Sequence, residues 1–152
     1  NMCHPRVHIA NVRLHLNAWH TKRRYQQKHA TTCLFCNNPD AVDAIEHFIR
    51  CPAIARATPL RLKATPHGCA SPRTWFLFQL AKQDTFLMAL FVYAVYTLHN
   101  TYSHATIRGG IVMHIHKIMH DVPLQPSLGK FVRRSLQAFE YSRCRSTKHV
   151  AP

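Results

Sequence analysis

Three cysteines and one histidine between residues 33 and 51 have the spacing of a metal site. They follow the pattern C-x2-C-x10-H-x3-C within the stretch CLFCNNPDAVDAIEHFIRCP. Thiolate sulfur and imidazole nitrogen are preferred ligands of zinc, which takes four of them in a tetrahedron when its role is structural. Four protein ligands leave no position for a catalytic water. The pattern therefore predicts one structural zinc ion, bound by Cys33, Cys36, His47 and Cys51.

Two other interpretations of these cysteines are open. The thiols could stay free in a reducing compartment, or they could belong to a disulfide set, since the chain has six cysteines. However, Cys3, Cys69 and Cys144 have no motif around them, whereas the other three share one with His47. This difference favours the metal site.

The second half of the motif predicts a helix that carries two of the ligands. Asp40 can cap this helix, and Asp43 would lie in its first turn, where negative charge suits the helix dipole. His47 and Cys51 are four residues apart, so they would project from the same face. Pro52 is expected to end the helix directly after the last ligand.

The zinc segment resembles the one that ends many non-LTR retrotransposon reverse transcriptases. Members of that family show a C-x2-C pair, a variable spacer with an acidic residue before an H-x3-C or H-x4-C, and often Cys-Pro. The upstream stretch VRLHLNAWHTKRRYQQKHATTC is similar to the helix and basic linker that precede the zinc segment there, so the resemblance covers about residues 7–56. In that family the region is thought to handle RNA or target DNA, which implies a nucleic-acid partner.

The sequence departs from that family in its chemistry. A Y-x-D-D polymerase motif is absent, and 152 residues are too few for the palm and fingers. The first residue is Asn1 and not Met, so we expect a processed chain or the end of a longer one. Outside the zinc segment no close pair of acids suggests acid–base catalysis. No nucleophile motif is present, and the four glycines form no phosphate-binding loop. The residues predict a binding protein without a small-molecule substrate, and not an enzyme.

The charge of the chain points to an acidic partner. Twenty Lys and Arg face six Asp and Glu, which gives a formal net charge of +14 at pH 7. Nucleic acid and anionic membranes are the usual partners of such a surplus. No base-reading set of side chains is visible, so we expect RNA to be bound by charge and shape. The expected contacts lie beside the zinc motif and on the last helix, at Lys22, Arg23, Arg24, Lys28, Lys130, Arg133, Arg134, Arg143 and Arg145.

Two smaller groups of residues leave alternatives open. The first group is aromatic and lies close to the basic residues between 22 and 28; it consists of Trp19, Tyr25 and Phe35. These rings could stack on bases, although for Trp19 packing into the core is favoured. The second group is three histidines between residues 114 and 120. They could form another metal site, because His116 and His120 would share a helix face. A surface or phosphate-contacting role is favoured because no cysteine accompanies them. These residues are His114, His116 and His120.

The elements that must position these residues are predicted to be helices in a single domain, 1–152. Residues 1–30 form a basic segment in which helix is favoured over strand, and residues 31–56 form the zinc knuckle. Residues 52–72 are rich in proline and are expected to be a connector with little regular structure. Residues 71–145 predict a bundle of about four helices, so the fold class is mainly α.

The bundle is expected to have a buried central helix. The stretch from Phe86 to Leu98 is apolar nearly all round and is too short for the ~20 residues that a bilayer needs. We expect Asp84 to cap this helix and no membrane span to form. The other helices are expected over 74–82, over 111–120 and from Ser127 onward.

Three functions compete on these observations. The favoured one is a structural subunit of a large ribonucleoprotein, such as a mitochondrial ribosome, that binds rRNA beside neighbouring proteins. The second is the nucleic-acid-binding C-terminal part of an active reverse transcriptase, which would act in the nucleus. The third is a protein–protein adaptor in another large organellar complex. The spread of basic residues from Arg6 to Lys148 and the missing polymerase favour the first.

Overall fold

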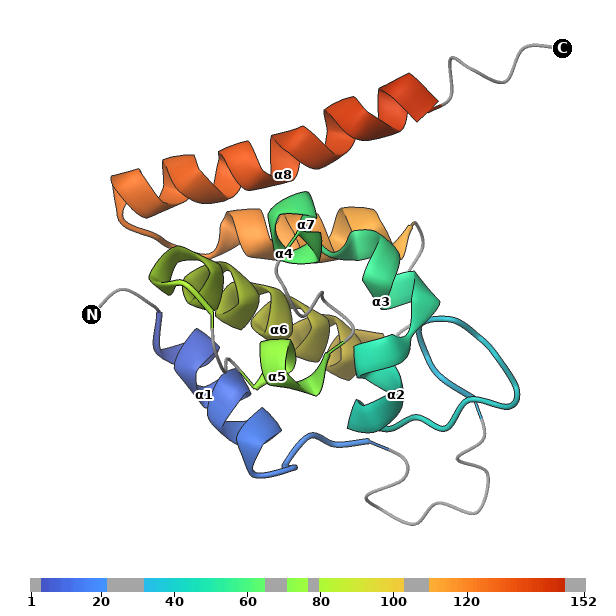
Figure 1. Cartoon of the computed structure of the whole chain (residues 1–152). Helices are drawn as coiled ribbons and strands as arrows, with labels where there is room; N and C mark the ends of the chain where they lie inside the picture. Colours follow the sequence, from blue (N-terminus) through green and yellow to red (C-terminus); the bar gives the residue numbers. More distant parts are fainter. Residues whose placement is uncertain (1–3, 22–31, 65–70, 77–79, 103–109, 147–152) are drawn as a thin grey trace, which may run out of the picture.

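The computed structural model describes residues 4–21, 32–64, 71–76, 80–102 and 110–146 (Figure 1). These ranges contain helices and no strand, which confirms the mainly α fold class. The helices, in chain order, are α1 (Pro5–His15), α2 (Ile45–Arg50), α3 (Pro52–Ala57), α4 (Leu60–Lys63), α5 (Pro72–Trp75), α6 (Lys82–Tyr102), α7 (Ile111–Asp121) and α8 (Pro126–Ser146).

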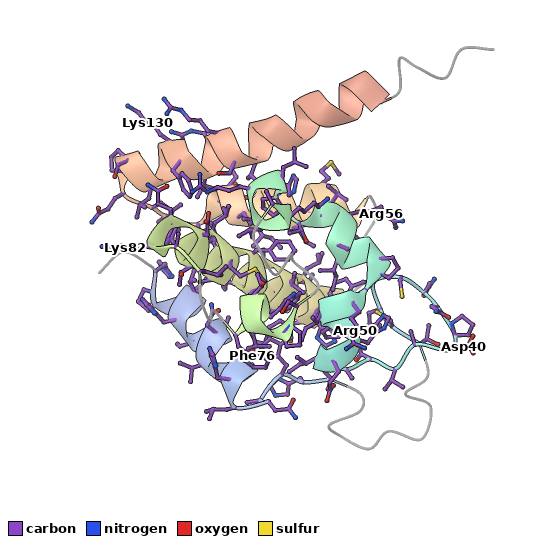
Figure 2. All side chains as sticks on the ribbon, viewed as in Figure 1. Asp40, Arg50, Arg56, Phe76, Lys82 and Lys130 are labelled. Carbon is purple, nitrogen blue, oxygen red and sulfur yellow. The ribbon has the colours of Figure 1, made fainter. Side chains whose placement is uncertain are left out.

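Helix α6 is the centre of the fold. It contacts α1, α4, α5 and α7, while α7 also packs against α3 and α8. In the view of Figure 1, α1 lies below α6, and α7 and α8 lie above it. Figure 2 shows side chains crowded around the helix. The prediction of a buried central helix is confirmed, because the buried residues include Phe86, Leu87, Met88, Leu90, Phe91, Val92, Ala94, Val95 and Leu98.

This burial accounts for the apolar run. Removing an apolar side chain of this size from water contributes about 1.5–3 kcal/mol, so α6 supplies a large part of the apolar driving force for folding. Within the described ranges, no helix combines the length and the apolar character that a membrane crossing requires.

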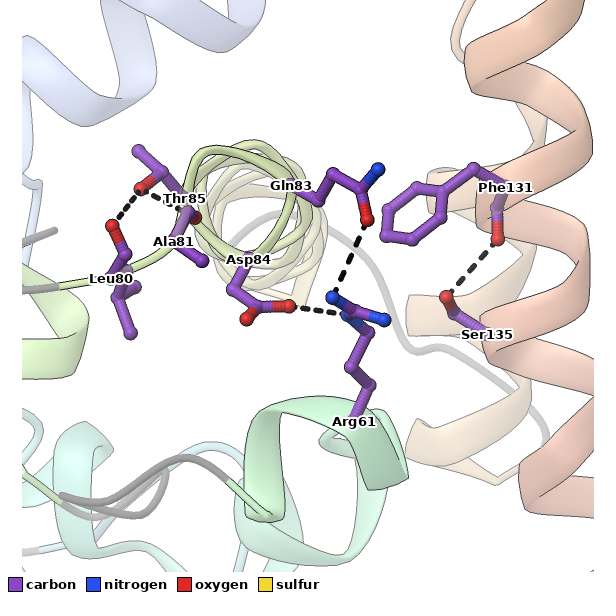
Figure 3. Close-up of polar contacts among 8 residues, drawn as sticks. All are labelled: Arg61, Leu80, Ala81, Gln83, Asp84, Thr85, Phe131 and Ser135. Atoms are coloured by element: carbon purple, nitrogen blue, oxygen red, sulfur yellow. Dashed lines mark hydrogen bonds and ion pairs between the residues drawn. The ribbon is translucent and has the colours of Figure 1, made fainter.

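The start of α6 differs from the prediction. The helix begins at Lys82, so Asp84 lies in its first turn and does not cap it. The Asp84 carboxylate instead accepts a hydrogen bond from the Nε of Arg61 in α4 (Figure 3). The guanidinium of Arg61 also lies 5.3 Å from the centre of the Phe131 ring in α8. One arginine therefore links α4, α6 and α8.

The prediction of a connector with little structure was wrong for residues 52–63. Helices α3 and α4 occupy most of this stretch. Pro52 stands at the first position of α3 and Pro59 directly before α4, where a missing N–H costs nothing and the fixed φ suits a helix. Both prolines start helices here. The prediction that a helix ends directly before Pro52 is confirmed, because α2 ends at Arg50 with Cys51 as its C-cap.

The remaining helices are close to their predicted places. α1 forms within the basic N-terminal segment and ends near Asn17, whose positive φ of 48° closes the turn. The helix expected over 74–82 is only the short α5, because Leu80 and Ala81 are not helical and residues 77–79 lie outside the described ranges. α7 and α8 agree with the prediction to within a residue at their starts.

Candidate metal centre

The four predicted ligands converge on one point. Their ligand atoms all lie within 4.8 Å of one another. The Sγ atoms of Cys33 and Cys51 are 4.0 Å apart, and the Sγ of Cys36 lies 3.4 Å from Nε2 of His47. Tetrahedral zinc with ordinary bond lengths holds such atoms about 3.5–3.8 Å apart. The arrangement could therefore hold a metal ion with little adjustment.

A tight turn brings the first two sulfurs together. The backbone N–H of Asn37 donates to the carbonyl of Cys33 at 3.0 Å, and the N–H of Phe35 lies 3.4 Å from the Cys33 sulfur. Asn37 has a φ of 55°, a left-handed conformation that asparagine tolerates better than most residues. The C-x2-C spacing thus folds as the sequence predicted.

The other two ligands are not on one continuous helix, which corrects the prediction. α2 begins only at Ile45, and Asp40 lies exposed in the preceding turn, where its N–H binds the Asn38 side chain. His47 lies in α2, whereas Cys51 is the junction between α2 and α3. Its extended backbone, with ψ at 122°, turns the sulfur toward the cluster before α3 starts.

Asp43 explains why α2 starts late. Its carboxylate faces Nε2 of His99 in α6, at 3.2 Å from each oxygen, and the two side chains are 1% and 0% exposed. This long-range contact holds residue 43 outside the helix, so Asp43 is not part of a first turn. A buried tertiary contact outweighs the local preference for an acid near a helix N-terminus.

His99 is a buried residue beside the cluster whose contacts the sequence does not predict. Its ring packs against Phe48 and Phe35, with centroids 5.2 Å and 6.0 Å away, and these two phenylalanines meet edge to face at 5.3 Å. These ring contacts pack the zinc segment, which contains Phe35 and Phe48, against α6. In the sequence, the one indication of this buried contact is a histidine directly after a long apolar run, in a chain with only six acids.

The pKa values of Cys33 and Cys51 are shifted in opposite directions. The hydrogen bond with Cys33 lowers the pKa of Cys51 to about 5, although burial acts in the opposite direction. The same hydrogen bond, together with burial, raises the pKa of Cys33. At neutral pH the pair therefore holds one thiolate and one proton, and a metal ion would take the place of that proton.

Among the described residues, the histidines of α7 do not form a second metal centre. Within the ranges that the structure describes, the cysteine and histidine cluster is the one group of three or more possible metal ligands. Nε2 of His116 lies 2.9 Å from the carbonyl of Ala57, and His120 is exposed beside Asp121. The favoured alternative for His114, His116 and His120 stays a prediction.

The structure describes the side chains of only some of the predicted nucleic-acid contacts. Lys130, Arg133 and Arg134 are exposed on α8. Arg143 and Arg145 lie within the bounds of α8, but the structure does not describe their side chains. The remaining predicted contacts, Lys22, Arg23, Arg24 and Lys28, lie outside the described residues.

The aromatic residues proposed for stacking are core residues where they are described. Trp19 is fully buried, and its indole N–H donates to the carbonyl of Ala10 at 3.2 Å. Phe35 is buried beside the metal cluster. The preference for Trp19 in the core is confirmed.

Comparison with known proteins adds no relative to this description. No family model matches the chain, and neither a curated protein nor a solved structure matches it.

Proposed function

We propose that this chain is a non-catalytic RNA-binding protein, held together by one structural zinc ion, that serves as a subunit of a larger ribonucleoprotein. The observation that carries the proposal is a set of exposed cations on a fold that brings four cysteine and histidine ligands together. The two parts of the proposal have separate support.

The donor set supports zinc in a structural role. Three sulfurs and one imidazole nitrogen suit zinc better than the hard cations that prefer oxygen. Cys33 and Cys51 are fully buried, and Cys36 and His47 are partly buried. Four protein ligands in such a closed site leave no room for a substrate, so the ion would contribute folding energy and not catalysis.

The distribution of charge supports RNA. Among the described acids, Asp43 is engaged with His99 and Asp84 with Arg61. Exposed cations remain on well-separated elements, as the positions of Arg50, Arg56, Lys82 and Lys130 in Figure 2 show. A surface that is basic on several sides suits a polyanion that surrounds the protein, as RNA does in a large assembly.

The salt dependence of RNA binding tests this function. The full zinc-loaded chain should bind single-stranded RNA with an affinity that falls linearly on a log–log plot, by about 0.7 per phosphate contact. A Lys130→Gln, Arg133→Gln, Arg134→Gln variant should show a slope smaller by about 2. Absent binding near physiological salt, or binding that salt does not weaken, would contradict the proposal and favour an adaptor between proteins.

A second candidate function rests on the order of the elements. The resemblance to reverse transcriptases implies a helix before the zinc segment, and this candidate is supported by the position of α1 in the chain and by the spacing of the four ligands. In that function the same surface would engage template RNA or target DNA. Equal affinity for duplex DNA and RNA of the same length, at the same salt, would favour this candidate over the ribonucleoprotein subunit.

A further inference from the structure

A groove of about 400 Å³ runs between α1 and α6, away from the metal centre. One wall comes from α1 and the other from α6, and both sets of residues recur at helical spacing, so each set lies on one face of its helix. The volume falls within the range of small-ligand sites in proteins. The residues that matter here are Arg6, Ile9, Arg13, Tyr93, Tyr96 and Asn100.

The two walls are held firmly against each other. The side-chain amide of Asn11 donates to the carbonyl of Ala89 in α6 at 3.0 Å and to that of Val7 at 2.8 Å. Val7 and Leu14 are fully buried on the same side of α1. The groove is therefore a fixed feature of the packing of α1 on α6.

The groove carries positive charge that no described acid neutralises. The guanidinium of Arg13 donates to the Tyr96 hydroxyl and lies 5.7 Å from the centre of that ring, which holds it in place. Neither Arg6 nor Arg13 forms an ion pair with a described carboxylate, in contrast to Arg61, which binds Asp84. No acidic residue lines the groove. Two arginines on one wall suit the oxygens of a phosphate.

We propose that this groove binds one nucleotide of a single-stranded RNA. The phosphate would lie at Arg6 and Arg13, and the base would stack on the partly exposed ring of Tyr93, with Ile9 on the α1 wall. Asn100 offers hydrogen bonds to the sugar or to a base edge. The inference rests on the proposed RNA-binding function and names a site for it.

A matched pair of charge variants tests the phosphate contact. The full zinc-loaded chain is titrated against a fluorescent single-stranded RNA of eight nucleotides. Arg6→Gln with Arg13→Gln should weaken binding tenfold or more. The control, Lys63→Gln with Lys117→Gln, removes the same charge from exposed residues of α4 and α7 and should change affinity less than threefold.

A second variant tests the base contact. Tyr93→Leu keeps the charge and much of the apolar volume but removes the ring, so the affinity should fall about fivefold with an unchanged salt slope. Tyr93→Phe retains the stacking surface and should bind like the unaltered protein. Circular dichroism of each variant confirms that the helices are intact.

The outcomes separate this inference from the function on which it rests. If the unaltered protein binds RNA but the groove and control variants lose the same affinity, the groove site is refuted and the RNA-binding function stands. If the unaltered protein does not bind RNA, both fail. If the arginine variant loses RNA binding, Tyr93→Leu does not, and polyglutamate displaces RNA from the protein, the groove is a site for acidic protein and the nucleotide assignment is overturned.

Discussion

At the scale of single residues, the contact between Asp43 and His99 determines how the metal segment meets the core. Both side chains are buried, and they join residues 56 positions apart in the chain. A buried polar pair contributes little when it is intact, but removing one partner leaves the other without compensation. The stability of the fold should therefore be sensitive to replacement of either residue, although neither is a predicted metal ligand.

Replacing one member of this pair should destabilise the protein strongly. We expect His99→Phe to lower the free energy of unfolding by about 3 kcal/mol, because the Asp43 carboxylate stays buried without its partner. Adding Asp43→Asn should cost less than the sum of the single changes, and urea unfolding of the four members of this double-mutant cycle measures the difference. Thr101→Ala, at an exposed position of the same helix, is the control and should change stability by no more than about 0.5 kcal/mol. Additive effects would show that the two residues do not depend on each other.

The sulfur pair predicts how metal affinity depends on pH. Cys33 has a raised pKa and keeps its proton at neutral pH, whereas Cys51, with a pKa of about 5, has already lost its own. Binding of zinc must release the Cys33 proton, so affinity should rise by at least about tenfold per pH unit between about pH 6 and pH 8. Competition with a chelator of known affinity measures this slope, and an affinity that does not change with pH would refute the assignment.

At the scale of elements, α6 is the helix that packs against α1, α4, α5 and α7. Phe91 is fully buried in it and meets the ring of Trp75 in α5 edge to face, with centroids 6.1 Å apart. We expect Phe91→Ala to cost about 3–5 kcal/mol, through lost burial and the cavity left behind. Leu16→Ala is the control, because Leu16 is 70% exposed and should tolerate truncation. Equal denaturation midpoints for the two variants would show that α6 is not the core.

The elements also show what the sequence could and could not predict. The apolar run of α6 and the C-x2-C turn depend on neighbouring residues, so local patterns were sufficient to predict them. The late start of α2 depends on Asp43 reaching His99, and local preference alone gave the wrong boundary. The prediction of a connector with little structure rests on the prolines of residues 52–72, and it fails at Pro52 and Pro59 because a proline can stand at the start of a helix as well as after the end of one. The groove depends on how α1 crosses α6, which no local pattern encodes.

At the scale of the whole molecule, two opposing features have to be reconciled. One cluster of buried residues extends from Val7 to Leu136 through the described chain, so the metal segment and the helices share a core. The net charge of +14 opposes compaction through self-repulsion. A bound metal adds its binding free energy to folding, and a polyanion screens the repulsion. The proposed zinc ion and RNA would both act in this direction.

The zinc content of the full chain is the most direct test of this account. Native mass spectrometry of protein purified without added metal should show one zinc ion per chain. Cys51→Ser should lose it, whereas Cys69→Ser, which changes a cysteine outside the motif, should retain it. A chain without zinc, or a Cys51→Ser variant with unchanged zinc content, would contradict the claim that this cluster is a structural metal centre.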